Sequence, residues 1–327
     1  MKMNRNKILS QLNAKHRVAL ATHTHPDGDA YGSLLGMKHI LSSRLEHVDA
    51  YAETDDSLKF DFLPGYSLIK SVNDIPKAEY DICFVLDCGN ADRLGDFQIL
   101  LNQASKIINI DHHISNTEFG HLNWIEPGAS STSEMITQLA QTEELLINQD
   151  GATCLLTGII MDTGSFLYEN TAAATHQAAA LLLDAGADQD MIRFHLFQNR
   201  PFQNVKFLGY LLNHMEIVMD GQVVLLTVSK QLLMEFGVAY EDLDEYISYV
   251  RDIEGIELAV ILKEINKNEV KISFRSKSWL NVNELAAQLN GGGHERAAGA
   301  VYQGSLEDIR EVLIPFIQQS FHGGQKP

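Results

Sequence analysis

The chain has 327 residues, of which 45% are hydrophobic and 21% are charged, with 23 glycines and only 7 prolines. This composition is typical of a globular protein and excludes a fibrous or largely disordered chain. The net charge of −18, from 25 Lys and Arg against 43 Asp and Glu, argues against a protein that coats long nucleic acids through many phosphate contacts.

The N-terminal segment and the three cysteines bear on the cellular compartment. No apolar stretch approaches the roughly 20 residues that cross a bilayer, and the polar start MKMNRNKILSQLNAKHR lacks the apolar region of a signal peptide. Cys83, Cys88 and Cys154 have apolar neighbours and are too few for a disulfide framework or a zinc finger. We therefore expect a cytoplasmic protein that does not bind membranes.

The first half of the sequence alternates short apolar runs with helical patterns. The runs at 17–22, 80–86 and 106–110 are rich in β-branched residues and end in polar residues, as buried parallel strands do. Apolar residues at helical spacing predict helices at 30–45 and 130–146, the second with a Ser/Thr capping signal. This order predicts a doubly wound α/β domain with a mainly parallel sheet, whose ligands bind beyond the C-terminal strand ends.

The second half changes character. The stretch 187–215 has a long helical pattern broken by Pro201, and we interpret it as a helical linker between a catalytic domain at 1–186 and a second domain at 216–327. Strands and helical segments mix in the second domain, which predicts a smaller α+β domain with a mixed sheet. The pattern around 266–268 predicts a β-hairpin.

Acidic and imidazole side chains cluster where predicted elements of the first domain end. Taken alone, each aspartate would be typical of a turn or a helix cap, and Asp29 in particular could cap a helix. Several carboxylates at one end of one sheet would repel each other without cations, so the clusters predict a metal site. The clusters are His23 with Asp27 and Asp29, then Asp87, then Asp111 with His112 and His113, and finally Asp162.

The types of ligand indicate which metal fits. Carboxylate oxygens with one or two imidazoles and no thiolate favour Mn²⁺, with Mg²⁺, Co²⁺ or Fe²⁺ as alternatives, over a structural zinc ion. The number of candidate ligands implies two ions. Two ions roughly 3.5 to 4 Å apart can activate a bridging water and stabilise the leaving oxygen of a phosphoryl displacement.

In their order, the four clusters resemble the motifs of the DHH phosphoesterase superfamily. The resemblance implies that Asp111 orients an imidazole and that His113 contacts the substrate phosphate or the leaving group. His25 stands where relatives often carry another polar residue, and we leave it outside the ligand set. The resemblance implies one metal ion held by His23, Asp27, Asp87 and Asp162, and another held by Asp29, Asp87, His112 and Asp162.

The segment Asn-Gly-Gly-Gly-His at 290–294 carries a second resemblance. Glycines let backbone N–H groups approach an anion, and an imidazole can hydrogen-bond a phosphate, although a glycine run is as often only a flexible turn. With Phe-Arg-Ser-Lys at 274–277, the segment resembles the DHH-associated C-terminal domain, whose GGGH loop faces the metal site across a cleft. The resemblance implies the substrate-binding residues Arg275, Ser276, Gly291, Gly292, Gly293 and His294.

Three functions stay open. The whole chain is similar to the nanoRNase/pAp-phosphatase group, which implies release of 5'-mononucleotides from very short RNA, with 3'-phosphoadenosine 5'-phosphate (pAp) as a second candidate substrate. The rivals are a phosphodiesterase of c-di-AMP or its linear product pApA, and a non-catalytic protein that binds metal or nucleotide. The oligomeric state also stays open, with a homodimer as one alternative. Arg93, in the segment GNADRLG, could reach a phosphate, cap a helix or pair with Asp92.

Overall fold

The computed structural model describes residues 8, 12–54, 59–240, 243–293 and 295–323, and it divides the chain into two compact units, Met1–Asn199 and Arg200–Pro327. The division falls inside the predicted linker. There the chain forms α6 (Gln189–Arg193), a π-helix (Phe194–Gln198) and α7 (Phe202–His214), with Pro201 directly before α7. The predicted domain boundaries at 186 and 216 stay predictions.

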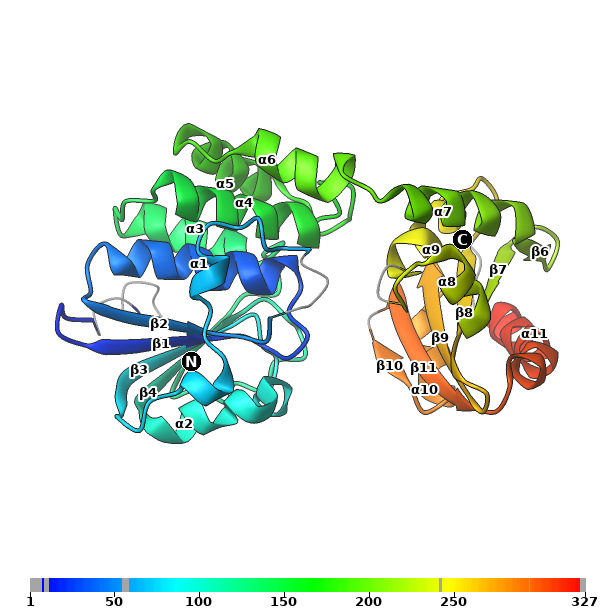
Figure 1. Cartoon of the computed structure of the whole chain (residues 1–327), viewed down its shortest axis with the longest axis horizontal. Coiled ribbons are helices and arrows are strands. Elements are labelled where there is room, and N and C mark those ends of the chain that lie inside the picture. The colour runs from blue at the N-terminus through cyan, green and yellow to red at the C-terminus, as the bar shows by residue number, and fades with distance from the viewer. Residues whose placement is uncertain (1–7, 9–11, 55–58, 241–242, 294, 324–327) are drawn as a thin grey trace. The chain divides into compact units, whose positions relative to one another are not determined.

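The first unit contains a sheet of five parallel strands in the order β2-β1-β3-β4-β5, which confirms the doubly wound class (Figure 1). The three predicted strands are confirmed as β1, β3 and β4. The patterns missed β2 and β5, which are short and polar at several positions. The strands are β1 (Arg17–Ala21), β2 (His47–Tyr51), β3 (Tyr80–Leu86), β4 (Ala104–Asp111) and β5 (Leu122–Ile125).

Helices cover both faces of this sheet, and one face carries more helices than the other. The larger group packs on Val18 and Leu20 of β1, and α2 with the 3-10 helix η5 packs on the opposite face, on Ala19 and Ala21 (Figure 1). The larger group is α1 (Gly28–Ser42), α3 (Thr132–Thr142), α4 (Gln149–Asp162) and α5 (Ala173–Asp184). The smaller elements are η3 (Tyr66–Leu68), η4 (Val72–Asp74), η5 (Ala91–Gln98) and α2 (Ile99–Gln103). Both predicted helices are confirmed as α1 and α3, although α3 ends at Thr142 rather than at 146.

Helices α1 and α4 form a close antiparallel pair. A Cβ atom at Gly28 would lie 2.3 Å from Cγ of Met161, and one at Gly32 would lie 2.6 Å from the carbonyl oxygen of Cys154. Because only glycine allows such an approach, the two backbones nearly touch. This packing brings the N-terminus of α1, which carries Asp29, beside the C-terminus of α4.

The second unit contains a six-stranded sheet in the order β10-β11-β9-β8-β7-β6. Only the β7–β8 pair is parallel within this sheet, so the predicted mixed sheet is confirmed, and β8 and β9 form the predicted hairpin. The strands are β6 (Glu216–Val218), β7 (Val223–Val228), β8 (Leu258–Asn266), β9 (Glu269–Ser276), β10 (Gly292–Gly293) and β11 (Ala297–Gln303). Its helices, besides α7, are α8 (Lys230–Phe236), α9 (Leu243–Arg251), α10 (Val282–Gln288) and α11 (Leu306–Gly323).

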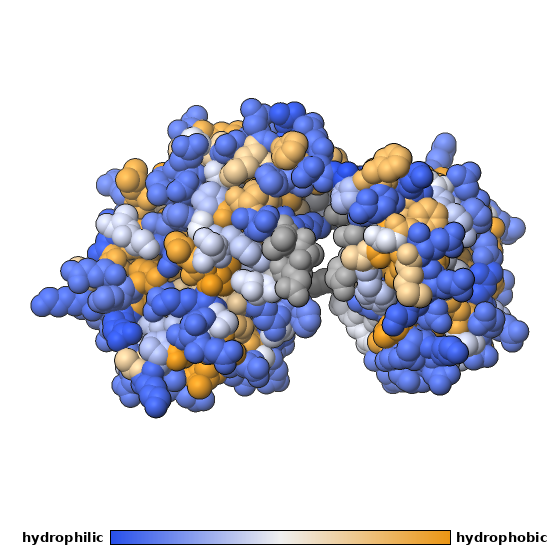
Figure 2. Space-filling view, in the orientation of Figure 1, coloured by the Kyte–Doolittle hydropathy of each residue, from blue (hydrophilic) through white to orange (hydrophobic). Residues whose placement is uncertain are grey.

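The helices of the second unit cover opposite faces of the sheet. Leu258 and Val260 of β8 share a core with α10 and α11, whereas Ala259 and Ile261 share a core with α7, α8 and α9. Within the described part of the chain, no helix is long and apolar enough to cross a membrane. On the face drawn in Figure 2, hydrophilic side chains outnumber hydrophobic ones on the surface of both units.

Candidate metal centre

The loop after β1 places the first two candidate ligands. His23 is buried two residues after the end of the strand, and its Nδ1 lies 2.8 Å from the carbonyl oxygen of Thr24. Asp27 caps α1, because its Oδ1 accepts hydrogen bonds from the backbone N–H groups of Asp29 and Ala30, each at 3.0 Å. A cap of this kind satisfies N–H groups that a helix start leaves free. The expectation that Asp29 could be the cap is therefore wrong, and Asp29 is left to act elsewhere.

Asp29 is buried against the N-terminus of α3. Its two carboxylate oxygens accept hydrogen bonds from the backbone N–H groups of Thr132, at 2.7 Å, and Ser133, at 2.9 Å. The helix start itself is capped by Ser131, whose hydroxyl accepts from the N–H of Glu134. The positive end of a helix stabilises a carboxylate placed on it. Thus α3 fixes the carboxylate that α1 presents.

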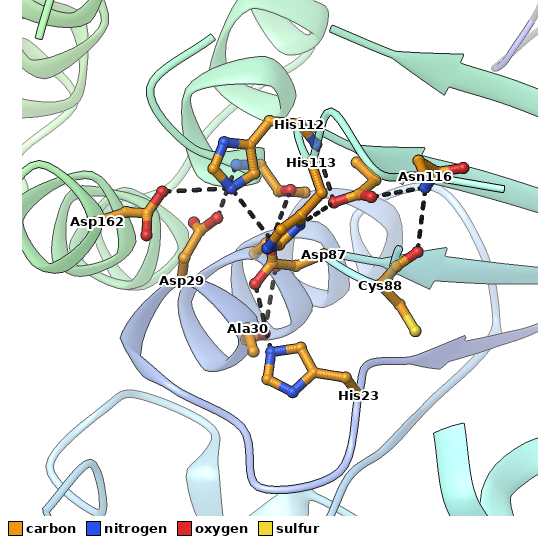
Figure 3. Close-up of polar contacts among 12 residues, drawn as sticks. His23, Asp29, Ala30, Asp87, Cys88, His112, His113, Asn116 and Asp162 are labelled. Carbon is orange, nitrogen blue, oxygen red and sulfur yellow. Dashed lines mark hydrogen bonds and ion pairs between the residues drawn. The ribbon is translucent and has the colours of Figure 1, made fainter. Parts of the chain in front are cut away.

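Asp87 lies at the centre of the cluster, directly after β3 (Figure 3). Its Oδ2 is 3.6 Å from Nε2 of His23, and its Oδ1 is 3.6 Å from Nε2 of His112 and 3.7 Å from Nδ1 of His113. The backbone φ of Asp87 is 54°, in the left-handed region that an aspartate adopts more readily than most residues. This buried carboxylate therefore faces three imidazoles.

Asp162 comes from the other side of the cluster, as the last residue of α4. Its Oδ2 is 3.3 Å from Nε2 of His112 (Figure 3). The side chain of Asn170 donates to the carbonyl oxygens of Asp162 and Ser130, both at 3.0 Å, and so ties the end of α4 to the segment before α3. The position of Asp162 therefore depends on how the helices pack.

Asp111 is fully buried behind the two histidines that follow it. Its Oδ1 accepts a hydrogen bond from the backbone N–H of His112 and lies 2.7 Å from Nδ1 of His113. Its Oδ2 accepts from the side-chain amide of Asn116 at 2.6 Å. Because an ionised carboxylate only accepts, Nδ1 of His113 carries the proton in this contact.

The cluster brings all six predicted ligands together. Ligand atoms within 4.8 Å of one another define three groups, namely His23 with Asp27 and Asp87, Asp29 with His112 and Asp162, and Asp87 with His112 and His113. The first two groups divide the ligands much as the resemblance implies, whereas Asp162 is grouped with only one of the two sets. Which residue binds which ion stays a proposal.

The electrostatics of the cluster favour a bound cation. Burial, followed by the negative charge of Asp87, raises the pKa of Asp29 to about 7, and burial together with the charge of Asp29 also raises the pKa of Asp162. Burial alone would raise the pKa of Asp87 too, but the three facing imidazoles hold it well below its usual range. A divalent cation would supply the positive charge that protons otherwise supply here, so the donor set fits a metal.

These shifts predict how the pH affects the metal-free protein. Asp29, whose pKa is raised to about 7, and Asp162, whose pKa is also raised, destabilise the folded chain at alkaline pH, where both carboxylates are ionised. The contribution of Asp29 to this loss of stability disappears as the pH drops through about 7. Burial lowers the pKa of His23, His112 and His113, but the neighbouring carboxylates outweigh burial and raise it. The charged imidazoles therefore stabilise the folded chain, and this stabilisation is lost as the pH rises through their raised pKa. Both effects have the same sign.

We therefore expect the free energy of unfolding of chelator-treated protein to be larger at pH 6 than at pH 8, as measured by urea denaturation. Saturating divalent metal provides the control, because it competes with protons for the same atoms and should weaken or reverse the trend. Metal-free protein that is more stable at pH 8 than at pH 6 would contradict this account of the cluster.

The predicted substrate residues of the second unit lie around neighbouring strands. Arg275 and Ser276 end β9, and Arg275 is paired in register with Ala297 of β11. Gly292 and Gly293 are exposed and form β10 beside β11. A Cβ at residue 291 would lie 2.1 Å from the carbonyl oxygen of the facing Gly299, so only glycine fits there. His294 lies outside the described residues. A role of these residues in substrate binding stays a proposal.

Reasoning from the sequence missed the residues that hold the ligands in place. Thr132 and Ser133 bind Asp29 through their backbones, while Asn116 and Asn170 bind Asp111 and the end of α4 through their amides. The run Ser-Ser-Thr-Ser-Glu at 130–134 indicated only a helix cap. That a carboxylate from α1 would sit on this helix start requires a contact between residues 103 positions apart.

The chain is similar to known proteins over most of its length. Residues 17–159 match the DHH family, N-terminal domain, and residues 220–319 match the DHHA1 domain. The bifunctional oligoribonuclease and PAP phosphatase NrnA of Thermus thermophilus is 32% identical over 306 residues, covering 90% of each chain. The protein of the same name from Bacillus subtilis is 27% identical over 301 residues, covering 90% of this chain and 92% of its own. An exopolyphosphatase-related protein from Bacteroides fragilis, known from its crystal structure, has a TM-score of 0.89 at 27% identity, covering 96% of this chain and 95% of its own.

Proposed function

The chain belongs to the DHH family, and from that membership we propose that it hydrolyses very short oligoribonucleotides to 5'-mononucleotides and pAp to AMP. The observation that carries the proposal is the meeting of six candidate ligands, from four separate segments, in one cluster beyond the strand ends. The names of the relatives that match nine-tenths of this chain support the same substrates. A homodimer and a cytoplasmic location stay predictions.

We propose that two divalent ions bind the cluster, with Mn²⁺ as the preferred metal because oxygen ligands predominate over imidazoles. When bound, the ions supply a water nucleophile at neutral pH and neutralise the charge of the phosphoryl group. Asp87, which faces His23 with one oxygen and His112 with the other, would serve both ions in this proposal. The proposed ligands are His23, Asp27, Asp87 and Asp162 for one ion, and Asp29, Asp87, His112 and Asp162 for the other.

His113 is the proposed contact to the phosphate or the leaving oxygen. The contact with Asp111 fixes one ring nitrogen as the protonated one and holds the ring in place. The carboxylates of Asp111 and Asp87 outweigh burial and raise the pKa of His113, which favours the protonated ring. A protonated ring can donate its second N–H to an oxygen that gains negative charge as the ester bond breaks.

This role of Asp111 can be tested with Asp111→Asn. The amide oxygen can still accept from the backbone N–H of His112 and from the ring, but the amide NH2 group would face the NH2 group of Asn116, which now donates to Oδ2. That clash and the loss of the negative charge should release His113 from its orientation while the ligand atoms stay. We expect kcat to fall roughly 10- to 100-fold, the usual effect of a partner that orients a functional group, with metal content close to that of the wild type. Asp184→Asn, at the exposed end of α5, removes the same charge and serves as the control. Wild-type turnover in Asp111→Asn would show that Asp111 only shapes the turn.

We propose further that the second unit binds the substrate through Arg275, Ser276, the glycines at 291–293 and His294. The exposed strand β10 consists of two glycines, which carry no side chains to block the approach of an anion to the backbone. The guanidinium of Arg275 adds a permanent positive charge to a chain that is acidic as a whole.

The function is tested by initial rates with Mn²⁺ on pApA, pGpG, pAp, c-di-AMP and a 24-nucleotide RNA. We expect pApA, pGpG and pAp to be cleaved fastest, because a chain of net charge −18 has few cations to hold the emerging phosphates of a long strand. Faster cleavage of c-di-AMP would favour a cyclic-dinucleotide phosphodiesterase. Binding of these compounds without any product would favour a non-catalytic protein.

A further inference from the structure

The position of Arg93 is fixed beside the metal centre by its backbone. Its N–H is capped by the side chain of Asn90, at 3.1 Å, in the first turn of η5, which follows β3. Its carbonyl oxygen accepts a hydrogen bond of 2.7 Å from the N–H of Thr24 in the loop that carries His23. Gly95 adopts a φ of 54°, and a Cβ there would lie 2.6 Å from Cγ2 of Thr24. The two loops are therefore in close contact, and Arg93 cannot shift without moving the loop of His23.

The side chain of Arg93 is exposed at this place. Asp92 and Asp96 flank it in the sequence, yet among the described residues no ion pair or side-chain hydrogen bond involves its guanidinium. Burial raises the pKa of the Cys88 thiol, and the positive charge of Arg93 opposes that rise. Of the three roles that the sequence left open for Arg93, the cap belongs to Asn90 and the pair with Asp92 is not formed.

The charges around Arg93 define what it can bind. The neighbouring cluster supplies carboxylates and, when occupied, two divalent ions, which are sufficient to hold the phosphate that reacts. Arg93, whose backbone is hydrogen-bonded to the loop of His23, carries a guanidinium with a planar set of N–H donors that matches two oxygens of a phosphate. We propose that Arg93 binds a second phosphate of the substrate, the one that is not cleaved. This inference rests on the proposed function, and it selects substrates that carry two phosphates, such as pAp and pApA, over diesters that carry one.

Arg93→Gln tests the inference, with kcat and KM measured in Mn²⁺ on pAp, on pApA, on the dinucleoside monophosphate ApA and on bis(p-nitrophenyl) phosphate. We expect KM for pAp and pApA to rise roughly 10- to 100-fold, the usual effect of losing a hydrogen bond to a charged group, with kcat nearly unchanged. KM for the two single-phosphate diesters should change less than about twofold, since neither offers the second phosphate. Arg93→Lys should recover part of the loss, because it keeps the charge and loses the planar donors.

Arg44→Gln is the matched control, because this exposed arginine follows α1 at the end opposite to Asp29. It should leave every KM unchanged, and both variants should keep the melting temperature and metal content of the wild type. An equal loss on all four substrates, or no change of KM in Arg93→Gln, would overturn the inference. Wild-type protein that cleaves none of the four compounds would overturn the proposed function instead, and calorimetric binding of pAp to the wild type and to Arg93→Gln would still decide the role of Arg93.

Discussion

Asp87→Ala should abolish hydrolysis and empty the metal centre. Asp87 belongs to two of the three ligand groups, and its oxygens face His23 on one side and both His112 and His113 on the other. Alanine removes the acceptor shared by these groups, so neither ion would keep a full set of ligands. We expect the rate on pApA to fall below about one-thousandth of the wild-type value, well beyond the effect of losing an orienting partner.

Elemental analysis of the dialysed Asp87→Ala variant provides the second measurement. The charge that Asp87 contributes against two divalent cations would be missing, so the variant should retain less than one ion per chain. In its metal-free form the pKa of His23 should fall, because Asp87 provides the hydrogen bond and the nearest charge that raise it, and NMR titration can follow this. Asp184→Ala should match the wild type in every measurement. Two retained ions with normal turnover would contradict the central role of Asp87.

The candidate ligands could be predicted from the sequence because they follow strands and helices that the local pattern reveals. Asp87 and Asp111 come at the ends of apolar strands, and the carboxyl ends of parallel strands meet at one edge of a sheet. The strand β2, with the sequence HVDAY, was missed because its charged and polar positions hide the apolar pattern. The four-residue strand β5 is too short to show a period.

The remaining features depend on contacts between distant segments, which no local pattern contains. The packing of α1, α3 and α4 determines two of these features. It brings the carboxylate of Asp29 to the N-terminus of α3, and it groups Asp162 with only one ligand set. That packing depends on glycines whose spacing along α1 also fits an ordinary helix. Their importance becomes visible only when the opposing atoms are known.

Gly158→Ala should couple a loss of stability to a loss of metal. A Cβ at position 158 would lie 2.1 Å from Oγ of Ser133 and 2.7 Å from Oδ1 of Asp29. The methyl group must therefore push α3 or the carboxylate away, and overpacking of this kind costs about 1 to 3 kcal/mol of unfolding free energy. Since Asp29 is held by the N–H of Ser133, the same displacement should weaken metal binding roughly 10- to 100-fold.

Two further glycine variants separate the two effects. In Gly32→Ala the added methyl group meets backbone atoms, the carbonyl oxygen of Cys154 at 2.6 Å and the nitrogen of Gly158 at 2.9 Å, so the helices must separate and stability should fall at least as far. Gly209→Ala, inside α7 with no atom within 4 Å, should instead stabilise the second unit by about 0.5 to 1 kcal/mol. Urea denaturation of the metal-free proteins at one pH measures the loss of stability without any contribution from bound metal, and metal titration of the folded proteins measures the affinity of the site. Wild-type stability and metal affinity in Gly158→Ala would mean that the close contact of α4 with α3 does not set the position of Asp29. If Ser133 and Asp29 move as one unit, Gly158→Ala should lose more metal affinity than Gly32→Ala does for the same loss of stability.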